Sequence, residues 1–175
     1  ENDNTIYTIG HSTHTLEEFI NMLKSFDIQI VADIRSLPGS SKFPQFNKEN
    51  LELSSPESGI QYIHLAELWG RRKVKKDSRN NRRNNDSFKG YADYMETVEF
   101  KNAIVVLEDI AHKQTTAYMC SEAVWRRCHR SMVSDYLKVK WWTVLHIMGE
   151  GKSQEHPYTS PARIVDGDVV YYDEA

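Results

Sequence analysis

Short apolar runs alternate with amphipathic segments along the chain, and this alternation restricts the fold more than any other feature. Strands are predicted at residues 5–9, 28–34, 60–65, 115–120 and 142–148. Helices are predicted at residues 15–26, 91–100, 101–113 and about 125–138. Such spacing indicates a mostly parallel sheet with helices on both faces. Five units are too few for a (β/α) barrel, so we expect an open three-layer α/β/α domain.

Local signals near the two ends of the chain add detail to this fold. Thr15 and Glu18 have the spacing of a capping box at a helix start. Asp166 and Gly167 lie between two apolar runs, which predicts a β-hairpin. The expected architecture is therefore a single α/β domain over residues 1–175, with about five strands in a mostly parallel sheet and a C-terminal β-hairpin.

The charge of the chain is unevenly distributed. Its formal net charge is −3, but residues 71–89 hold nine Lys or Arg and two Asp and so carry +7, which leaves −10 for the remainder. One basic stretch on an acidic body predicts an anionic partner there, either a nucleic acid or a phosphorylated small molecule. The alternative is a solvated, flexible insertion, since Val74 and Phe88 are its apolar residues.

The sequence also argues against several classes of protein. No run approaches the roughly 18 apolar residues of a membrane span, and no signal peptide is recognisable. Two cysteines do not make a disulfide framework. We therefore expect a cytoplasmic protein without membrane contact, of undetermined oligomeric state. Walker and G-x-G-x-x-G patterns are missing from the sequence, so no ATP or NAD cofactor is expected.

Polar residues gather at the carboxyl ends of the predicted strands, where open parallel sheets bind ligands. Three of them are candidate catalytic residues because a carboxylate acting as base or nucleophile with histidine assistance is coherent chemistry: His11, Asp33 and Glu122. The candidate substrate-binding residues are Ser12, Arg35, Lys42, Trp69, Arg71, Arg72, Cys120, His129 and Arg130. Arginines hold anions well. Alternatively, Asp33 and Arg35, which share a strand face, pair with each other as an ordinary ion pair.

The segment CSEAVWRRCHR permits several interpretations. Cys120 and Arg126 have the C-x5-R spacing of a phosphatase loop, but the charge of Glu122 inside the loop opposes a phosphate. Zinc requires four ligands, or three and a water. Cys120, Cys128 and His129 offer three at most, and Cys128 and His129 are neighbours on a predicted helix that point about 100° apart, so no metal site is expected. A disulfide or transient redox pair of the two cysteines, or a thiol enzyme using Cys120, remains an alternative to a structural role, which we favour for Cys128.

Six motifs in order resemble one family. The motifs YTIGHS, DIRSLPGS, IQYIHLAELWGRRK, YADYM, CSE and CHR, followed by the terminal hairpin, resemble the domain of unknown function family 488 from Tyr7 to about Tyr171. The resemblance implies a compact α/β domain with polar motifs along one sheet edge, and it implies no particular reaction. The matching motif positions are Gly10, His11, Ser12, Asp33, Arg35, Pro38, Gly70, Arg71, Arg72, Cys120, Glu122, Cys128, His129 and Arg130.

This sequence departs from the family pattern at two tryptophans. Trp69 stands before Gly70 where the family has a second glycine, which places an indole beside the basic stretch, either to stack on a base or simply to pack. Trp125 stands where many members have a proline, so a residue that helps to start a helix is missing.

The expected function follows from the strand-end cluster and the basic stretch. We expect an enzyme of the hydrolase or transferase type that acts on a nucleotide-like or nucleic-acid substrate at the carboxyl edge of the sheet. The alternative is a non-catalytic module that binds nucleic acid or a phosphorylated ligand.

Overall fold

The computed structural model describes residues 4–36, 39 and 41–173. Within them, the main sheet has six strands in the order β3-β2-β4-β1-β5-β6. Neighbouring strands are parallel, except that β6 is antiparallel to β5. The strands are β1 (Thr5–Gly10), β2 (Ile30–Asp33), β3 (Gln61–His64), β4 (Thr116–Cys120), β5 (Thr143–Gly149) and β6 (Lys152–Glu155).

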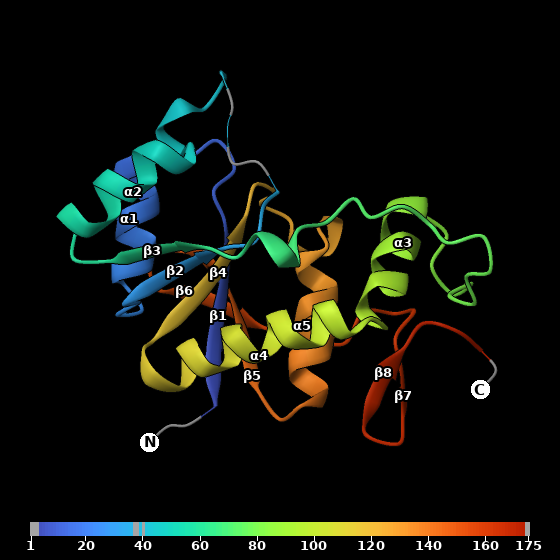
Figure 1. Ribbon diagram of the computed structural model, residues 1–175. Helices are drawn as coiled ribbons and strands as arrows, with labels where there is room; N and C mark the ends of the chain where they lie inside the picture. Colours follow the sequence, from blue (N-terminus) through green and yellow to red (C-terminus); the bar gives the residue numbers. More distant parts are fainter. Residues whose placement is uncertain (1–3, 37–38, 40, 174–175) are drawn as a thin grey trace.

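Helices cover both faces of this sheet (Figure 1). Successive side chains of a strand point to opposite faces, so Met119 packs toward the helices of one face and Tyr118 toward those of the other. The first face carries α1 (Leu16–Lys24) and α2 (Lys48–Glu57), and the second carries α3 (Asp86–Met95), α4 (Val98–Lys113) and α5 (Arg130–Val139). The three-layer α/β/α prediction is confirmed.

Both local signals at the ends of the chain are also confirmed. The Thr15 side chain accepts from the Glu18 N–H at 3.0 Å, and the Glu18 carboxylate accepts from the Thr15 N–H at 2.8 Å, which closes the capping box before α1. β7 (Arg163–Val165) and β8 (Asp168–Val170) form the predicted hairpin. Asp166 and Gly167 between them have φ angles of 52° and 77°, as a tight hairpin turn requires.

The sequence patterns did not predict α2 or β6. Leu51 and Ser55 are the buried residues of α2, so the helix lacks the apolar stripe that identifies an amphipathic helix. All four residues of β6 are exposed, so this strand shows no alternation. Both elements form because neighbouring elements supply contacts, α2 against β3 and β6 against β5.

Several predicted helix boundaries were wrong. The helix predicted at residues 91–100 ends at Met95, and the helix predicted from residue 101 begins at Val98. The helix expected from about residue 125 begins at Arg130, and residues 125–127 form a short 3-10 turn instead. The helix expected from residue 91 begins at Asp86, because the Asn85 side chain caps it by accepting from the Ser87 N–H at 2.8 Å. The end of the basic stretch is therefore helical.

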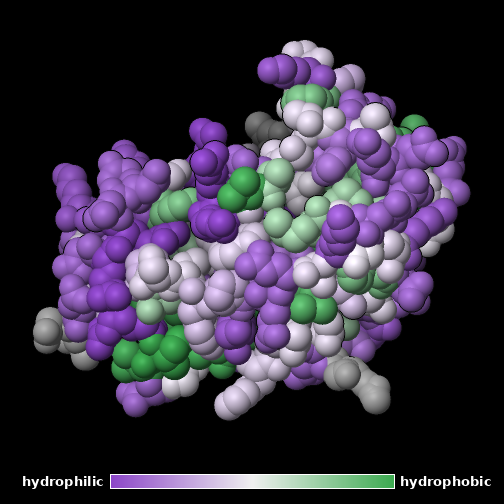
Figure 2. Space-filling view, turned by 180° about the vertical axis from the view of Figure 1, so that it is seen from behind, coloured by the Kyte–Doolittle hydropathy of each residue, from purple (hydrophilic) through white to green (hydrophobic). Residues whose placement is uncertain are grey.

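The rest of the basic stretch is held against α3 by one buried carboxylate. Asp93 accepts from the Lys75 N–H at 2.9 Å, from the Ser78 hydroxyl at 2.6 Å and from the Asn80 side-chain amide at 2.7 Å. Seen from behind, the side of the molecule that carries this stretch is densely hydrophilic (Figure 2). Hydrogen bonds to Asp93 thus give a strongly polar segment a defined path.

Candidate functional site at the carboxyl edge of the sheet

The centre of the sheet contains a topological switch point. Gly10 ends β1 beside Cys120 at the end of β4, and the chain continues from β1 to α1 on one face and from β4 to α5 on the other. Open α/β sheets bind ligands at such points. A Cβ atom on Gly10 would stand 1.8 Å from the Glu122 backbone oxygen, so only glycine fits where the loop after β4 passes β1.

Asp33 and Arg35 form a buried ion pair at the end of β2. The carboxylate accepts from Nη2, Nε and the backbone N–H of Arg35 at 2.7, 2.9 and 3.0 Å, and from the Tyr62 hydroxyl at 2.5 Å. Burial and then the Asp33 charge raise the pKa of Tyr62. The pairing weighed from the sequence is confirmed. Because four donors occupy the Asp33 carboxylate, its geometry suits positioning of Arg35, and a role as base stays a prediction.

His11 connects this pair to β1. Its Nε2 accepts from Arg35 Nη1 at 3.2 Å, so its Nδ1 carries the proton and donates to the Ser12 carbonyl at 2.9 Å. The ring stacks on Phe46 with a centroid distance of 4.4 Å and an interplanar angle of 17°. Burial is the main cause that lowers the pKa of His11. A neutral imidazole in a defined tautomer therefore lies beside a fixed guanidinium.

The backbone pairing of β1 with β4 continues beyond the strand ends. The His11 N–H donates to the Cys120 carbonyl at 3.0 Å and the Ser12 N–H to the Ser121 carbonyl at 2.8 Å. Ser12 adopts a left-handed conformation with φ 49°, which costs about 1–3 kcal/mol for a non-glycine residue. These bonds maintain the strained turn and leave Ser12 partly exposed at the edge.

The two cysteines contact each other across the loop after β4. Both are free, and their sulfur atoms lie 2.7 Å apart. Burial opposes ionisation of Cys120, but hydrogen bonding to Cys128 and the charge of Arg130 together lower its pKa to about 7. Burial and the neighbouring Cys120 raise the pKa of Cys128. The pair therefore consists of one thiol with a lowered pKa and one with a raised pKa, a difference that sequence spacing did not reveal.

Arg130 is buried and supports the loop after β4. Its side chain is 1% exposed, donates to the Glu122 carbonyl at 2.9 Å and to the Thr8 hydroxyl at 3.2 Å, and approaches the Ala123 carbonyl at 3.4 Å. Its buried Nε atom has no hydrogen-bond partner among the residues that the structure describes. The geometry thus suits Arg130 to holding the loop that carries Glu122, and its predicted contact with substrate stays a prediction.

A hydrogen-bonded chain runs inward from Arg130 through buried side chains. The Thr8 hydroxyl lies 2.6 Å from His146 Nδ1, His146 Nε2 lies 2.8 Å from His156 Nδ1, and His156 Nε2 lies 2.8 Å from Asp135. Since Arg130 can only donate to Thr8, the order that satisfies every atom has Thr8 donating to His146, His146 to His156, and His156 to Asp135.

Sequence reasoning missed most of this chain. The apolar run WTVLHIM contains His146, and a histidine inside such a run was the one visible signal. No sequence spacing connects His156 or Asp135 to His146. His156 follows β6, a strand that was not predicted, and Asp135 lies on α5. Asp135 also accepts from the hydroxyls of Tyr171 and Thr159 at 2.7 and 2.6 Å.

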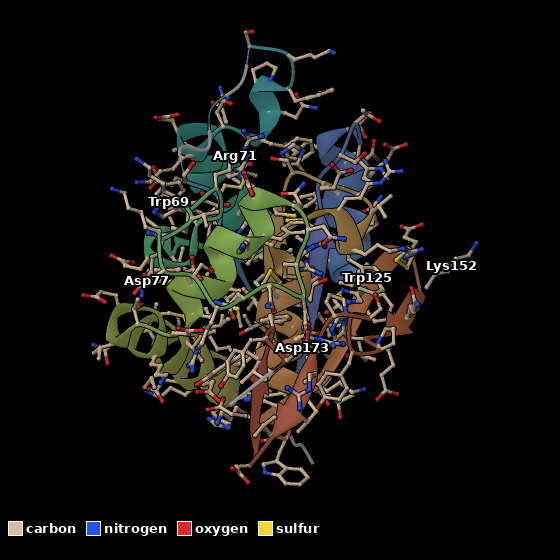
Figure 3. All side chains as sticks on the ribbon, turned by 90° about the vertical axis from the view of Figure 1, so that its right-hand side faces the viewer. Trp69, Arg71, Asp77, Trp125, Lys152 and Asp173 are labelled. Carbon is tan, nitrogen blue, oxygen red and sulfur yellow. The ribbon has the colours of Figure 1, made fainter. Side chains whose placement is uncertain are left out.

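Trp125 covers one side of this chain. Its ring stacks on His146 with a centroid distance of 4.5 Å and an interplanar angle of 5°, and its Nε1 donates to the Gln154 side chain at 3.2 Å. In Figure 3 it lies toward β6, apart from Trp69 and Arg71. The indole at the family's proline position therefore packs on a histidine instead of starting a helix.

Two further histidines join the strand ends to the rest of the fold. His64 Nε2 lies 2.6 Å from the Arg35 carbonyl, and His129 Nε2 lies 3.2 Å from the Ile34 carbonyl. Burial lowers the pKa of His129 to about 4. A Cβ on Gly70 would stand 2.6 Å from His129 Nδ1. His129 is thus an internal link between α5, β2 and the loop after β3, and its predicted contact with substrate is untested.

The basic stretch begins with a cation–π clamp. The Arg72 guanidinium lies 4.2 Å from the Trp69 ring centroid and 3.6 Å from that of Tyr94, and it donates to the carbonyls of Trp69 and Glu67. Arg71 is exposed and left-handed, with φ 60°. Trp69 and Arg71 lie near each other in Figure 3. The clamp occupies Arg72 and one face of the indole, while Arg71 projects its charge at the surface.

The remaining predicted residues are exposed or lie outside the described part of the chain. Lys42 and Glu122 have exposed side chains, and the family position Pro38 lies outside the described residues. Arg126 is exposed, with its guanidinium 5.3 Å from the Trp125 ring. This arrangement does not place Arg126 over Cys120 as a phosphatase loop would.

Neither a metal centre nor a membrane span emerges from the described part of the chain. Its histidines, cysteines and carboxylates form no group of three or more that could hold a metal ion. Across those same residues, no helix combines the length and apolar character needed to cross a bilayer.

Comparison with known proteins identifies the family. The model of the domain of unknown function DUF488 matches residues 15–137. The chain belongs to the DUF488 family. The match covers the Asp33–Arg35 pair and both cysteines of this DUF488 domain, whereas His11 and the C-terminal hairpin lie outside it. Searches of curated proteins and of solved structures gave no significant match.

Proposed function

We propose that this DUF488 protein is an enzyme of the hydrolase or transferase type that acts on a nucleotide-like or nucleic-acid substrate at the carboxyl edge of its sheet. One observation carries the proposal. The neutral His11 meets the anchored Arg35 at the switch point, and the Glu122 carboxylate is exposed at the same edge. A base beside a fixed guanidinium suits proton transfer next to an anionic group.

The hydrogen bond between Arg35 and His11 indicates the order of events in the proposal. An anionic group of the substrate takes the Arg35 Nη1 donor that now points at His11 Nε2. This exchange frees Nε2 to accept a proton from water or a substrate hydroxyl, and Glu122 serves as the second acid–base group. Asp33 acts as a positioning residue that keeps Arg35 in place.

The test is a product survey with nucleotides, sugar phosphates and oligonucleotides, followed by mass spectrometry. We expect turnover by the wild type and a loss of about 100-fold or more in His11→Gln and Glu122→Gln. Glu57→Gln, an exposed change on α2, is the matched control and should behave as the wild type. Wild-type turnover in both site variants would refute the assigned roles.

A second candidate function is a non-catalytic module that binds nucleic acid or a phosphorylated ligand. The exposed Arg71 at the start of a stretch with +7 charge favours it. Oligonucleotide affinity should then fall steeply with salt, and Arg71→Gln should reduce the logarithmic slope by about one unit. Lys113→Gln, at the exposed end of α4, should leave the slope unchanged. A flat salt response argues against nucleic acid.

A further inference from the structure

A polar basin lies on the basic stretch, away from the strand-end site. Its volume is about 360 Å³, within the range of small-molecule sites. The basin lies between the segment before α3 and a loop near the C-terminus, and it is lined by Arg82, Arg83, Asn84, Asn85, Phe88 and the Ser160–Pro161 pair. Figure 1 shows these two parts of the chain side by side at the right of the molecule.

Arg82 frames the basin and has its hydrogen bonds satisfied. Its Nε donates to the Pro161 carbonyl at 2.8 Å, and its Nη1 pairs with Asp173 at 2.7 Å. Its backbone N–H donates to the Tyr171 carbonyl at 3.0 Å. These contacts join the basic stretch to the C-terminal loop and neutralise the Arg82 charge.

Arg83 is placed differently. Its Nε and Nη2 atoms are buried, and no hydrogen-bond partner for them exists among the described residues. Its guanidinium lies 4.4 Å from the Phe88 ring centroid and 5.7 Å from that of Tyr171. Within the same residues no carboxylate forms an ion pair with it. Buried donors without partners are rare in folded proteins and carry a free-energy penalty, which a bound anion would remove.

The surroundings of Arg83 favour an anion over other ligands. Asp173 is already paired with Arg82, and the exposed Asp86 begins α3. The charge of Asp135 acts on Arg83, and the Asp135 carboxylate accepts hydrogen bonds from Tyr171 and His156. Arg83 thus has a charge that no direct ion pair within the described residues neutralises, and its Nε and Nη2 donors have the forked geometry that matches phosphate oxygens.

We propose that this basin is a phosphate-binding site anchored by the guanidinium of Arg83, which turns its covered Nε and Nη2 donors toward the bound phosphoryl group. The ligand is a phosphoryl group, carried either by a small molecule or by a nucleic-acid backbone. The site is separate from the strand-end cluster. Its test measures binding and not turnover, so the result does not depend on the catalysis proposed at that cluster.

The decisive experiment measures the binding of three probes: inorganic phosphate, adenosine 5′-monophosphate and a short oligothymidylate. Calorimetry gives the affinity of each probe, and the NMR signal of the Arg83 Nε–H reports whether the probe reaches Arg83. We expect at least one probe to bind and to shift that signal. Arg83→Gln should weaken binding at least about tenfold, and Arg83→Lys should also weaken it, since lysine keeps the charge but loses the fork.

Arg79→Gln is the matched control, because it removes the same charge from an exposed position in the same stretch. It should leave phosphate binding unchanged. Loss of binding of the phosphate and the monophosphate in Arg83→Gln identifies a small phosphorylated ligand. If the oligothymidylate responds instead, with a salt slope reduced by about one unit, the ligand is a nucleic acid.

Two results would overturn the site. One is equal weakening by Arg79→Gln and Arg83→Gln, which would mean that net charge alone attracts the probes. The other is an unchanged Arg83 Nε–H signal in the wild type at saturating concentrations of all three probes. The wild-type signal is informative even if Arg83→Gln fails to fold.

Discussion

The Nε2 atom of His146 lies 2.8 Å from the Nδ1 atom of His156, and both rings are buried. Asp135 accepts at one end of this pair and the Thr8 hydroxyl donates at the other. A proton added to His146 Nδ1 would turn this acceptor into a donor, so the Thr8 hydroxyl would lose the acceptor of its hydrogen. The interior of the domain is therefore sensitive to acid at a defined position.

Stability should fall as the pH is lowered below about 6.5, the usual pKa of an unfolded histidine. Burial, the neighbouring His156 and the charge of Arg130 lower the pKa of His146 to about 2, and burial lowers that of His129 to about 4. The unfolded chain binds these protons first, so the stabilisation is complete above pH 6.5 and is lost on acidification. Each histidine contributes a slope of up to about 1.4 kcal/mol per pH unit.

Urea unfolding between pH 7.5 and 4.5 would measure this slope. His146→Gln should flatten it relative to the wild type, because the variant cannot take up that proton. The exposed change Lys113→Gln should retain the wild-type slope. A His146→Gln slope equal to that of the wild type would show that the residue does not govern acid stability.

Asp135→Asn should destabilise the domain by about 2–4 kcal/mol. The new amide would present a donor to the hydroxyl of Thr159 or Tyr171, or to His156. Asp168→Asn is the control, since the Asp168 side chain is half exposed and pairs with Lys140 at 3.6 Å. That change should cost less than about 1 kcal/mol. Equal losses in chemical denaturation would contradict the structural role of Asp135.

Gly10→Ala should destabilise the fold by about 1–3 kcal/mol or more. The new methyl group would stand 1.8 Å from the Glu122 backbone oxygen, so the loop after β4 must shift. Gly149→Ala, whose Cβ would meet Lys152 at an ordinary 3.7 Å, is the control and should be close to neutral. A Gly10→Ala protein as stable as the wild type would mean that this loop moves freely.

Mild oxidation should join Cys120 to Cys128 within one chain. Their sulfur atoms are 2.7 Å apart and the Cys120 pKa is about 7, so a thiolate lies beside its partner near neutral pH. Treatment with diamide, which accepts the two thiol hydrogens, should leave no free thiol and give no dimer. The Cys128→Ser variant retains Cys120 alone, and this thiol should form no intramolecular disulfide under the same treatment. Two alkylatable thiols after oxidation of the wild type would contradict the contact.

The layered fold was predictable because its signals are local. The capping box of Thr15 and Glu18 and the turn at Asp166 each involve residues close in sequence, and both formed as predicted. α2 and β6 escaped prediction because their residues carry no periodic apolar pattern. Their presence depends on neighbours that are distant in sequence.

The candidate site was predictable only in its location. The sequence shows that four candidate residues lie at or just after strand ends, and the structure brings them to one edge of the sheet: His11, Asp33, Arg35 and Cys120. Their separate environments were not evident. Asp33 is fully buried under four donors, whereas Glu122 is exposed, although both are acidic residues close to strand ends.

The sequence by itself determined most of the alternation of strands and helices, the capping box of Thr15 and Glu18 and the hairpin, because these depend on side-chain period and on turn chemistry within a few residues. Only the tertiary structure decided the strand order β3-β2-β4-β1-β5-β6. That order brings Thr8 to His146, 138 positions away. The packing before α3 leaves the Nε and Nη2 atoms of Arg83 without a hydrogen-bond partner among the described residues. Partners so distant in sequence are chosen by packing and strand pairing, which no local pattern encodes.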